Sequence, residues 1–365
     1  MKILHAILSQ GFHGSERHCV ELATAQARAG HQVEVLIHGG GSNCARIFAE
    51  EIAAANAATA AERGAGHIRL VVIPRAFPAW LHRPFARQAL RRFSPDIVHT
   101  HLNPAARRIG RVAQGLGIPH VATLHIRYEA REHADCDGLI CGASWQRDEI
   151  GPEFHGIATV VWAWLPAAVH AALGRITPAE VADLRRAWNA DDAVAVFGSI
   201  GRLMAEKGMD VLVSAFRAAF PRGDEPVRLV ILGVGPQADM LRGLADVDTR
   251  IVLLGSQPEI APFYGAFDVY VSASRFEPFG LTILEAMDAG CALVVTRTQG
   301  PREFLKEAGV LWAEPNDAAA LASQLRAAAG RGRERTRYDL SPFAQARGVA
   351  AIEDLYRQIL ARRKR

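Results

Sequence analysis

Short apolar segments alternate with amphipathic segments along almost the whole chain of 365 residues. Such alternation predicts parallel β-sheets that are covered by helices on both faces. The pattern occurs twice, and a less regular stretch between residues 165 and 190 interrupts it. We therefore predict an α/β protein with two doubly wound, Rossmann-like domains that face each other across a cleft. A C-terminal helix is predicted to cross back to the first domain.

The domain boundaries predicted from this pattern are residues 1–166, residues 167–341, and a C-terminal helix with a basic tail at residues 342–365. In the first domain the apolar runs predict strands at residues 2–8, 32–37, 68–73, 96–101, 120–125, 138–141 and 159–164. In the second domain they predict strands at residues 193–200, 227–232, 250–254, 268–272, 292–296 and 309–312. Amphipathic spacing predicts helices that include residues 15–29 and 104–116. Because doubly wound sheets bind ligands at the carboxyl ends of their strands, the site is expected in the cleft.

Composition and cysteine content favour a cytoplasmic globular protein. Hydrophobic residues make up 50% of the chain and charged residues 22%. No apolar run reaches the roughly 18 residues that a membrane span needs. The N-terminal residues predict a first strand rather than a secretory signal. The five cysteines are odd in number and lack paired metal-binding spacing, which indicates reduced thiols.

The most specific pattern in the sequence is RFEPFGLTILEAMDAG at residues 275–290. Its two glutamates, Glu277 and Glu285, lie eight positions apart, and Phe279 and Gly280 stand where a helix begins after a strand-like run. The free N–H groups of a helix N-terminus bind anions. One carboxylate in the loop and one on the helix would flank the anion, an arrangement that suits a sugar diphosphate.

A second loop places two cations where a strand of the second domain ends. Residues 199–210 read SIGRLMAEKGMD, in which Gly201 permits a turn, Arg202 follows it, and Lys207 precedes the next helix. Arginine offers a fork of donors and lysine a point charge, a combination that suits a diphosphate. A solvated loop with two surface charges is the alternative. The pattern at residues 275–290 favours the functional interpretation.

These segments resemble the retaining GT-B glycosyltransferases, in particular the large family called glycosyl transferases group one. The resemblance covers nearly the whole chain, and its strongest parts are Gly201-Arg-Leu…Glu206-Lys-Gly208 and Glu277-Pro-Phe-Gly-Leu-Thr-Ile-Leu-Glu-Ala286. In the first domain, Phe12-His-Gly-Ser-Glu-Arg17 resembles the family's Gly-Gly-x-Glu-Arg loop, although one of the paired glycines is absent. Val121-Ala-Thr-Leu-His125 resembles the segment whose terminal histidine points at the donor sugar.

The resemblance implies a reaction and a role for each matched residue. The reaction is metal-independent, retaining transfer of a hexosyl group from a nucleotide diphosphate sugar to an acceptor hydroxyl, without a cofactor. Arg202 and Lys207 would neutralise the donor diphosphate. Glu277 would contact the transferred sugar together with His125, and Glu285 would hold the ribose. The other donor-binding positions that it implies are Gly14, Gly233, Phe279, Gly280, Leu281 and Thr282, the last three through N–H groups that face the distal phosphate.

Three weaker signals receive a plainer interpretation. Residues Gly233–Ala238 fit the G-x-G-x-x-A dinucleotide pattern, which is weak alone, and a glycine turn is ordinary at this place in the resembled family. His99 and His101 lie on one predicted strand face, but no third metal ligand is evident in the sequence, so we predict no metal site. Trp162 and Trp164 alternate as in a strand and are interpreted as packing residues of the hinge, with the acceptor side of the cleft as the alternative.

A basic region stands out in the first domain. Between Glu62 and Glu129 the only acidic residue is Asp96. Helical spacing predicts a basic stripe with an aromatic residue at its start, formed by Trp80, Arg83, Arg87 and Arg91. Such a segment binds anionic bilayers, which predicts peripheral association with the inner face of the membrane. A surface helix whose neighbouring apolar stripe packs on its sheet is the alternative, and no nucleic-acid-binding module matches.

The acceptor and two rival functions are left open by the sequence. The basic, aromatic first domain favours an anionic or lipid-linked acceptor, a glycan such as an envelope polysaccharide or lipopolysaccharide core. One rival is another GT-B enzyme of sugar nucleotides, an epimerase or phosphorylase. The other rival is a non-catalytic partner subunit with the same fold, and the presence of both cations and both glutamates argues against it.

Overall fold

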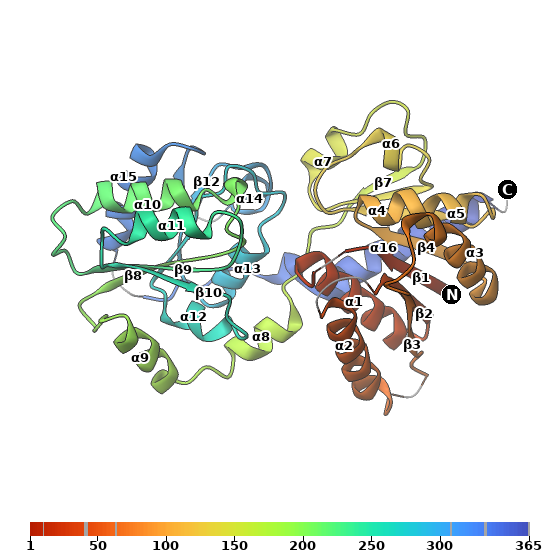
Figure 1. Cartoon of the computed structure of the whole chain (residues 1–365), viewed down its shortest axis with the longest axis horizontal. Coiled ribbons are helices and arrows are strands. Elements are labelled where there is room, and N and C mark those ends of the chain that lie inside the picture. Colours follow the sequence, from red (N-terminus) through yellow and green to blue (C-terminus); the bar gives the residue numbers. More distant parts are fainter. Residues whose placement is uncertain (10, 40–42, 63, 307–308, 332–333, 364–365) are drawn as a thin grey trace. The chain divides into compact units, whose positions relative to one another are not determined.

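The computed structural model describes residues 1–9, 11–39, 43–62, 64–306, 309–331 and 334–363 (Figure 1). The chain divides into two compact units, the first made of Met1–Trp164 with Phe343–Arg365 and the second of Leu165–Pro342. The second unit is therefore one continuous segment, whereas the first is completed by the C-terminal segment. Residues 364 and 365 of the expected basic tail lie outside the described residues.

The first unit contains a seven-stranded parallel sheet in the order β3-β2-β1-β4-β5-β6-β7. Its strands are β1 (Lys2–Ile7), β2 (Gln32–His38), β3 (Ile68–Ile73), β4 (Ile97–His101), β5 (His120–Leu124), β6 (Gly138–Cys141) and β7 (Ile157–Val160). Its helices are α1 (Gly14–Arg28), α2 (Cys44–Thr59), η1 (Ala79–Leu81), α3 (His82–Phe93), α4 (Asn103–Ala105), η2 (Ala106–Gly110), α5 (Arg111–Gln114), α6 (Ala130–His133), α7 (Ser144–Asp148) and α16 (Gln345–Arg363).

Strand β1 shows why this sheet is covered on both faces. Successive side chains of a strand point to opposite faces. Accordingly, Leu4 packs with Leu90 of α3 in one core cluster, whereas Ile3 packs with Ile352 and Tyr356 of α16 in another. Because both faces are buried, the strand is a nearly continuous apolar run. The C-terminal helix thus belongs to the first unit, as the sequence predicts.

The second unit contains a six-stranded parallel sheet in the order β10-β9-β8-β11-β12-β13. Its strands are β8 (Ala195–Ile200), β9 (Val227–Leu232), β10 (Ile251–Gly255), β11 (Val269–Ser272), β12 (Ala292–Thr296) and β13 (Leu311–Ala313). Its helices are α8 (Ala167–Leu173), α9 (Pro178–Ala187), η3 (Ala205–Lys207), α10 (Met209–Ala219), α11 (Ala238–Ala245), α12 (Ala261–Ala266), α13 (Leu281–Asp288), α14 (Gln299–Phe304) and α15 (Ala318–Ala329), and a short turn η4 (Ser341–Phe343) follows them. Helices α10, α11 and α15 share one core cluster with the strands, and Figure 1 shows α9 and α12 on the other side of the sheet. Each unit is therefore a doubly wound, Rossmann-like domain.

One local prediction is wrong. The strand expected at residues 159–164 is β7, and it ends at Val160. Beyond it, Trp162 stacks on Phe343 with ring centroids 5.6 Å apart, and buried Trp164 donates from Nε1 to Glu21 Oε2 at 2.7 Å. Both tryptophans are packing residues, as interpreted, but not in a strand. The helix expected at residues 104–116 is present as continuous helical residues 103–114, in which the π-helical turn η2 joins α4 to α5.

Among the described residues, no helix is both long and apolar enough to cross a membrane.

Candidate functional site

The loops that follow β8 and β11 meet at the carboxyl edge of the second sheet, because these two strands are paired neighbours. The first loop carries Lys207 and the second carries Glu277. The Lys207 ammonium donates to Glu277 Oε2 at 2.6 Å, across 70 positions of sequence. We call these two residues the lysine–glutamate pair. Two residues that the sequence assigned to one donor site are therefore in direct contact.

The Glu277 carboxylate is held from several sides. Its side chain is 9% exposed, compared with 23% for that of Lys207. Ser274 Oγ also donates to Glu277 Oε2 at 3.2 Å, and the Glu277 carbonyl accepts from the Gly300 N–H at 3.0 Å. A nearly buried carboxylate is stable only when it is paired and hydrogen-bonded. The site therefore presents a fixed carboxylate beside an ammonium that still reaches solvent.

Arg275 was missed by the sequence analysis and fixes the turn that carries Lys207. Its guanidinium makes two bonds to the Asp210 carboxylate, at 2.8 and 2.7 Å, and Nη1 also donates to the Ala205 carbonyl at 2.7 Å. The hydrogen bonds from Arg275 lower the pKa of Asp210. Arg275 thus ties η3 to the start of α10. A lone arginine beside Glu277 gave no signal in the sequence, because its partner lies 65 positions away.

The glycine turn after β9 has a packing role. Gly233 has a φ of +145°, and a Cβ atom there would lie 1.8 Å from the Gly201 carbonyl oxygen. The Gly201 N–H also donates to Leu232 at 3.0 Å. The glycine pattern therefore allows the loops after β8 and β9 to touch. The structure places Gly233 at the predicted donor edge, and the close contact accounts for the glycine without a dinucleotide.

Helix α13 begins directly after the lysine–glutamate pair. Gly280, its N-cap, has a φ of +116°, a conformation that favours glycine. The Phe279 side chain anchors the turn, because it is 8% exposed and its ring centroid lies 4.9 Å from that of Phe304. The first N–H groups of a helix have no partner within the helix. Those of half-buried Leu281 and Thr282 are therefore at the helix end that favours an anion.

Glu285 lies on the same helix, one turn further along, and is only 6% exposed. The Tyr264 hydroxyl of α12 donates to Glu285 Oε2 at 2.6 Å. Burial, and after it the Glu285 charge, raises the pKa of Tyr264 well above its ordinary range, so the phenol stays a donor. Tyr264 is thus a further orienting residue that the sequence did not reveal. Arg202, by contrast, is exposed.

In the first unit, the predicted residues Gly14 and His125 lie at the carboxyl edge of the sheet. Helix α1 begins at Gly14, and the His13 N–H donates to Glu16 Oε2 at 2.8 Å, so the helix starts without a second glycine. His125 follows β5 directly and is half-buried. The Gln146 amide donates to the carbonyls of Leu124 and Ile126, at 2.9 and 2.8 Å. The backbone on both sides of His125 is thereby fixed.

Behind His125, side chains form a hydrogen-bonded row into the core, which we call the histidine chain: His125, His101, His5 and Gln26. His125 Nε2 lies 3.2 Å from His101 Nδ1, His101 Nε2 lies 3.1 Å from His5 Nδ1, and His5 Nε2 lies 2.7 Å from Gln26 Oε1. Burial lowers the pKa of His5 to about 4 and that of His125 to about 4. Burial, followed by the neighbouring imidazoles, lowers the pKa of His101 well below its ordinary range. The imidazoles are therefore neutral at pH 7.

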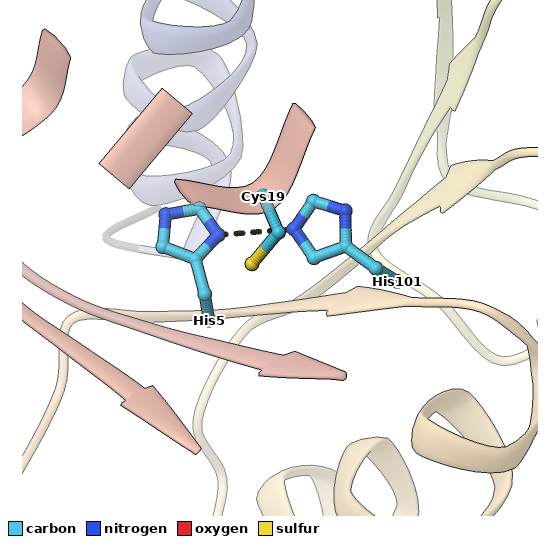
Figure 2. A group of neighbouring side chains, drawn as sticks. All are labelled: His5, Cys19 and His101. Atoms are coloured by element: carbon cyan, nitrogen blue, oxygen red, sulfur yellow. Dashed lines mark hydrogen bonds between the residues drawn. The ribbon is translucent and has the colours of Figure 1, made fainter. Parts of the chain in front are cut away.

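Cys19 of α1 lies beside the middle of this chain (Figure 2). Ligand atoms of His5, Cys19 and His101 lie within 4.8 Å of one another, and all three residues are buried. The sequence pattern pointed to His101 as a possible ligand but not to His5 or Cys19, which come from different elements. His99, paired with His101 in the sequence, instead contacts Tyr356 Oη at 2.6 Å and Thr123 Oγ1 at 2.7 Å. Figure 2 shows the hydrogen bond that joins the His5 and His101 rings, so the two nitrogens that a metal would need already bind each other.

The predicted basic stripe is exposed, and its apolar neighbour is not. Arg83, Arg87 and Arg91 are exposed on α3, and Trp80 of η1 is 72% exposed. The neighbouring apolar stripe packs into the core through side chains such as buried Ala89. The apolar stripe therefore packs on the sheet, as the alternative interpretation proposed, and the arginines and Trp80 face solvent.

Comparison with known proteins gives matches to both units. Residues 194–330 match the model of a family described as glycosyl transferases group 1, and residues 12–187 match that of glycosyltransferase family 4. The chain is 27% identical over 254 residues to the GDP-mannose-dependent alpha-mannosyltransferase of Corynebacterium glutamicum. This match covers 64% of this chain and 58% of that protein. The chain is also 31% identical over 198 residues to the lipopolysaccharide core biosynthesis mannosyltransferase LpsB of Rhizobium meliloti. This second match covers 48% of this chain and 56% of that protein.

The chain thus spans a little over half the length of these two relatives. Among solved structures, the Anabaena protein HepE in complex with UDP and glucose superposes with a TM-score of 0.73. The sequence identity is 17%, and the match covers 100% of this chain and 99% of that chain. At this identity the likeness shows a common fold.

Proposed function

We propose that this chain, which belongs to the glycosyl transferases group 1 family and has the two-domain GT-B fold, transfers a sugar from a nucleotide diphosphate sugar to an acceptor hydroxyl. The observation that carries the proposal is the contact of the lysine–glutamate pair beside the N-terminus of α13. This edge combines an ammonium, a fixed carboxylate and helix N–H groups. A sugar diphosphate needs all three, because it joins two negative charges to a hydroxyl-rich ring.

The leaving diphosphate explains the positive groups. As the bond between the anomeric carbon and the diphosphate oxygen breaks, negative charge grows on that oxygen. Lys207, Arg202 and the N–H groups of Leu281 and Thr282 stabilise this charge, and groups fixed in advance do so without reorganisation. Lys207 has three N–H donors, so it binds Glu277 and a phosphate oxygen at once. These charges come from the chain itself, and the proposed chemistry needs no resident metal or cofactor.

The remaining residues position the donor. Glu285, oriented by Tyr264, accepts hydrogen bonds from the ribose, and Glu277 and His125 contact the transferred sugar. The acceptor oxygen bonds to the anomeric carbon from the face that the diphosphate leaves, so configuration is retained. Its proton passes to an oxygen of the departing phosphate. No side chain in this scheme forms a covalent bond to the sugar, and Glu277 serves to position it.

Donor and acceptor are inferred from the relatives. One relative's name specifies GDP-mannose, and the solved structure with the same fold contains UDP and glucose. The LpsB relative is named for lipopolysaccharide core synthesis, which supports an envelope glycan as acceptor. We therefore propose GDP-mannose and UDP-glucose as the first donors to test, with a lipopolysaccharide core glycan as acceptor.

Binding of the correct donor is expected to raise the melting temperature of the protein. A ligand at 100 times its dissociation constant stabilises the folded state by about 2.7 kcal/mol. Differential scanning fluorimetry with GDP-mannose, UDP-glucose and the free nucleotides measures this shift, and the variant Lys207→Met should lose most of it. If no nucleotide sugar shifts the transition, the partner-subunit alternative is favoured. Product formed from donor alone, without acceptor, would instead indicate an epimerase or phosphorylase.

We further propose that Trp80 and the three arginines of α3 bind an anionic membrane surface, which would bring the site to a lipid-linked acceptor. The supporting observation is the 72% exposure of Trp80 beside exposed arginines. Each cation near such a surface contributes about 1 kcal/mol, so replacing Arg83, Arg87 and Arg91 by glutamine should weaken binding about 100-fold. Sedimentation with phosphatidylserine-containing vesicles at low salt measures this effect.

The matched control for this experiment replaces the same number of exposed arginines elsewhere, Arg175, Arg222 and Arg242 of the second unit, by glutamine. It changes the net charge equally and should leave vesicle binding nearly intact. Equal losses in both variants would point to a general effect of net charge and would contradict a defined membrane surface.

A further inference from the structure

The histidine chain of the first unit links the proposed sugar-contacting residue to a buried glutamine. His5, His101 and Gln26 are each 0% exposed, and only His125 at the end of the chain reaches the surface. The proposed reaction makes no use of the inner three residues. They lie in the core at positions where apolar side chains would pack without a desolvation cost.

The direction of the hydrogen bonds along this chain follows from its inner end. The Gln26 carbonyl oxygen only accepts, so His5 Nε2, 2.7 Å away, carries the hydrogen. In a neutral imidazole the other nitrogen then has a lone pair, so His5 Nδ1 accepts from His101 Nε2 at 3.1 Å. By the same rule, His101 Nδ1 accepts from His125 Nε2 at 3.2 Å. His125 is left with its hydrogen on Nε2 and a lone pair on Nδ1.

We propose that Gln26 is a positioning residue for sugar transfer, because through His5 and His101 its carbonyl fixes His125 in the tautomer that leaves Nδ1 as an acceptor for a donor-sugar hydroxyl. The inference rests on the proposed function, because the tautomer of His125 affects sugar transfer only if His125 contacts the donor sugar. A rotated Gln26 amide would reverse every bond in the chain and would make His125 Nδ1 a donor. One side chain, far along α1 from the helix start, therefore selects the hydrogen-bonding character of the site.

The backbone contacts of His125 do not provide this control. Gln146 holds the carbonyls on either side of His125, which fixes the main chain but leaves both ring tautomers open. The edge contact with the His18 ring, whose centroid lies 5.6 Å from that of His125, also does not distinguish the two nitrogens. The bond from His125 Nε2 to His101 does distinguish them.

The direct test is ¹⁵N NMR of the full-length protein labelled at histidine, at pH 7.5, where the two tautomers give distinct nitrogen signals. For the wild type we expect a protonated Nε2 and an unprotonated Nδ1 on His125. Gln26→Met, which has a similar volume but no acceptor, should give a mixture of tautomers. Gln26→Glu offers an oxygen acceptor in either protonation state and should preserve the wild-type signal. Gln345→Met, in the same unit, is the matched control and should change nothing.

Activity provides the second measurement. Gln26→Met should lower kcat/KM for the donor about tenfold, the effect of one net hydrogen bond, while the melting temperature monitors folding. Gln26→Glu should recover most of this loss. An Nδ1-protonated His125 in the wild type, or an unchanged tautomer in Gln26→Met, would overturn the proposal. So would stoichiometric zinc in the purified protein that is lost in His5→Asn, because the facing nitrogens of His5 and His101 would then both be metal ligands.

Failure of the proposed function and failure of the positioning role of Gln26 give different results. If the wild type neither binds nor transfers any sugar of the donor panel, the proposed function fails, and the NMR experiment still decides the direction of the chain. If transfer depends on His125 but is indifferent to Gln26→Met, only the positioning role of Gln26 is lost.

Discussion

Replacing Lys207 by methionine is expected to lower kcat/KM for sugar transfer by at least about 100-fold, the usual cost of removing one fixed donor to a developing oxyanion. The change removes the cation that the structure places 2.6 Å from the Glu277 carboxylate. It also leaves that carboxylate, only 9% exposed, without its counter-ion. We expect a loss of about 2 kcal/mol in stability, less than for a fully buried pair because the lysine reaches solvent. Steady-state kinetics and urea unfolding measure the two effects.

The partner variant Glu277→Gln separates charge from shape at the same site. It keeps hydrogen-bonding atoms for the sugar but removes the charge opposite Lys207, and we expect a loss of similar size. Lys306→Met and Glu314→Gln, exposed residues of the same unit, are the matched controls and should retain full activity. Normal activity in both Lys207→Met and Glu277→Gln would remove the lysine–glutamate pair from the proposed mechanism.

Acidification is expected to destabilise the first unit at pH values well above those at which carboxylates titrate. Burial lowers the pKa of His5 and of His125 to about 4, and that of His120 to about 3. In the unfolded chain an imidazole binds a proton below about pH 6.5. The unfolded state therefore binds more protons between pH 6.5 and 4, and the stability that is complete above pH 6.5 is lost as the pH falls. Each such imidazole lowers the free energy of unfolding by about 2 kcal/mol between pH 7.5 and 5.

Urea unfolding at pH 7.5, 6 and 5 measures this effect. Carboxylates whose pKa is lowered by arginine hydrogen bonds, such as Asp210 and Asp248, lose their contribution only below about pH 4. The change in the free energy of unfolding above pH 5 therefore reports protonation of the histidines. His101→Asn should reduce the pH slope by about 1.4 kcal/mol per pH unit, and His155→Gln, which removes an exposed imidazole, is the control. A free energy of unfolding that is flat from pH 7.5 to 5 would contradict the neutral state of the buried imidazoles.

The spacing of apolar residues was sufficient to predict the fold, because the two sheets are parallel and buried on both faces. Strands such as β3, β6 and β9 have the bounds that their apolar runs predict. Periodicity failed where tertiary packing decides. Trp162 and Trp164 alternate as in a strand, but they pack against Phe343 and Glu21, which are far apart in the sequence. In residues 104–116 the helical pattern predicted the helix but not the π-helical turn within it.

The candidate site could be predicted only where residues with charges stand in one short segment. Glu277 and Glu285 share a loop and helix, so their spacing was visible. Residues that orient the site were not visible, because each meets its partner across a long stretch of chain: 65 positions for Arg275 and Asp210, and 21 for Tyr264 and Glu285. Gln26 lies on α1 among alanines, and nothing in its neighbours in the sequence points to the imidazole of His5.

The return of α16 to the first unit has a consequence for biosynthesis. The N-terminal part of a chain leaves the ribosome first, and each domain folds once its residues have emerged. The second unit, Leu165–Pro342, has its whole sequence before α16 exists. Until then Ile3, Ile97 and Val121 lack the helix that shares their core cluster. The half of the protein that is translated first is thus the last that can close its core, and its nascent sheet is the surface for which a ribosome-bound chaperone would have most use.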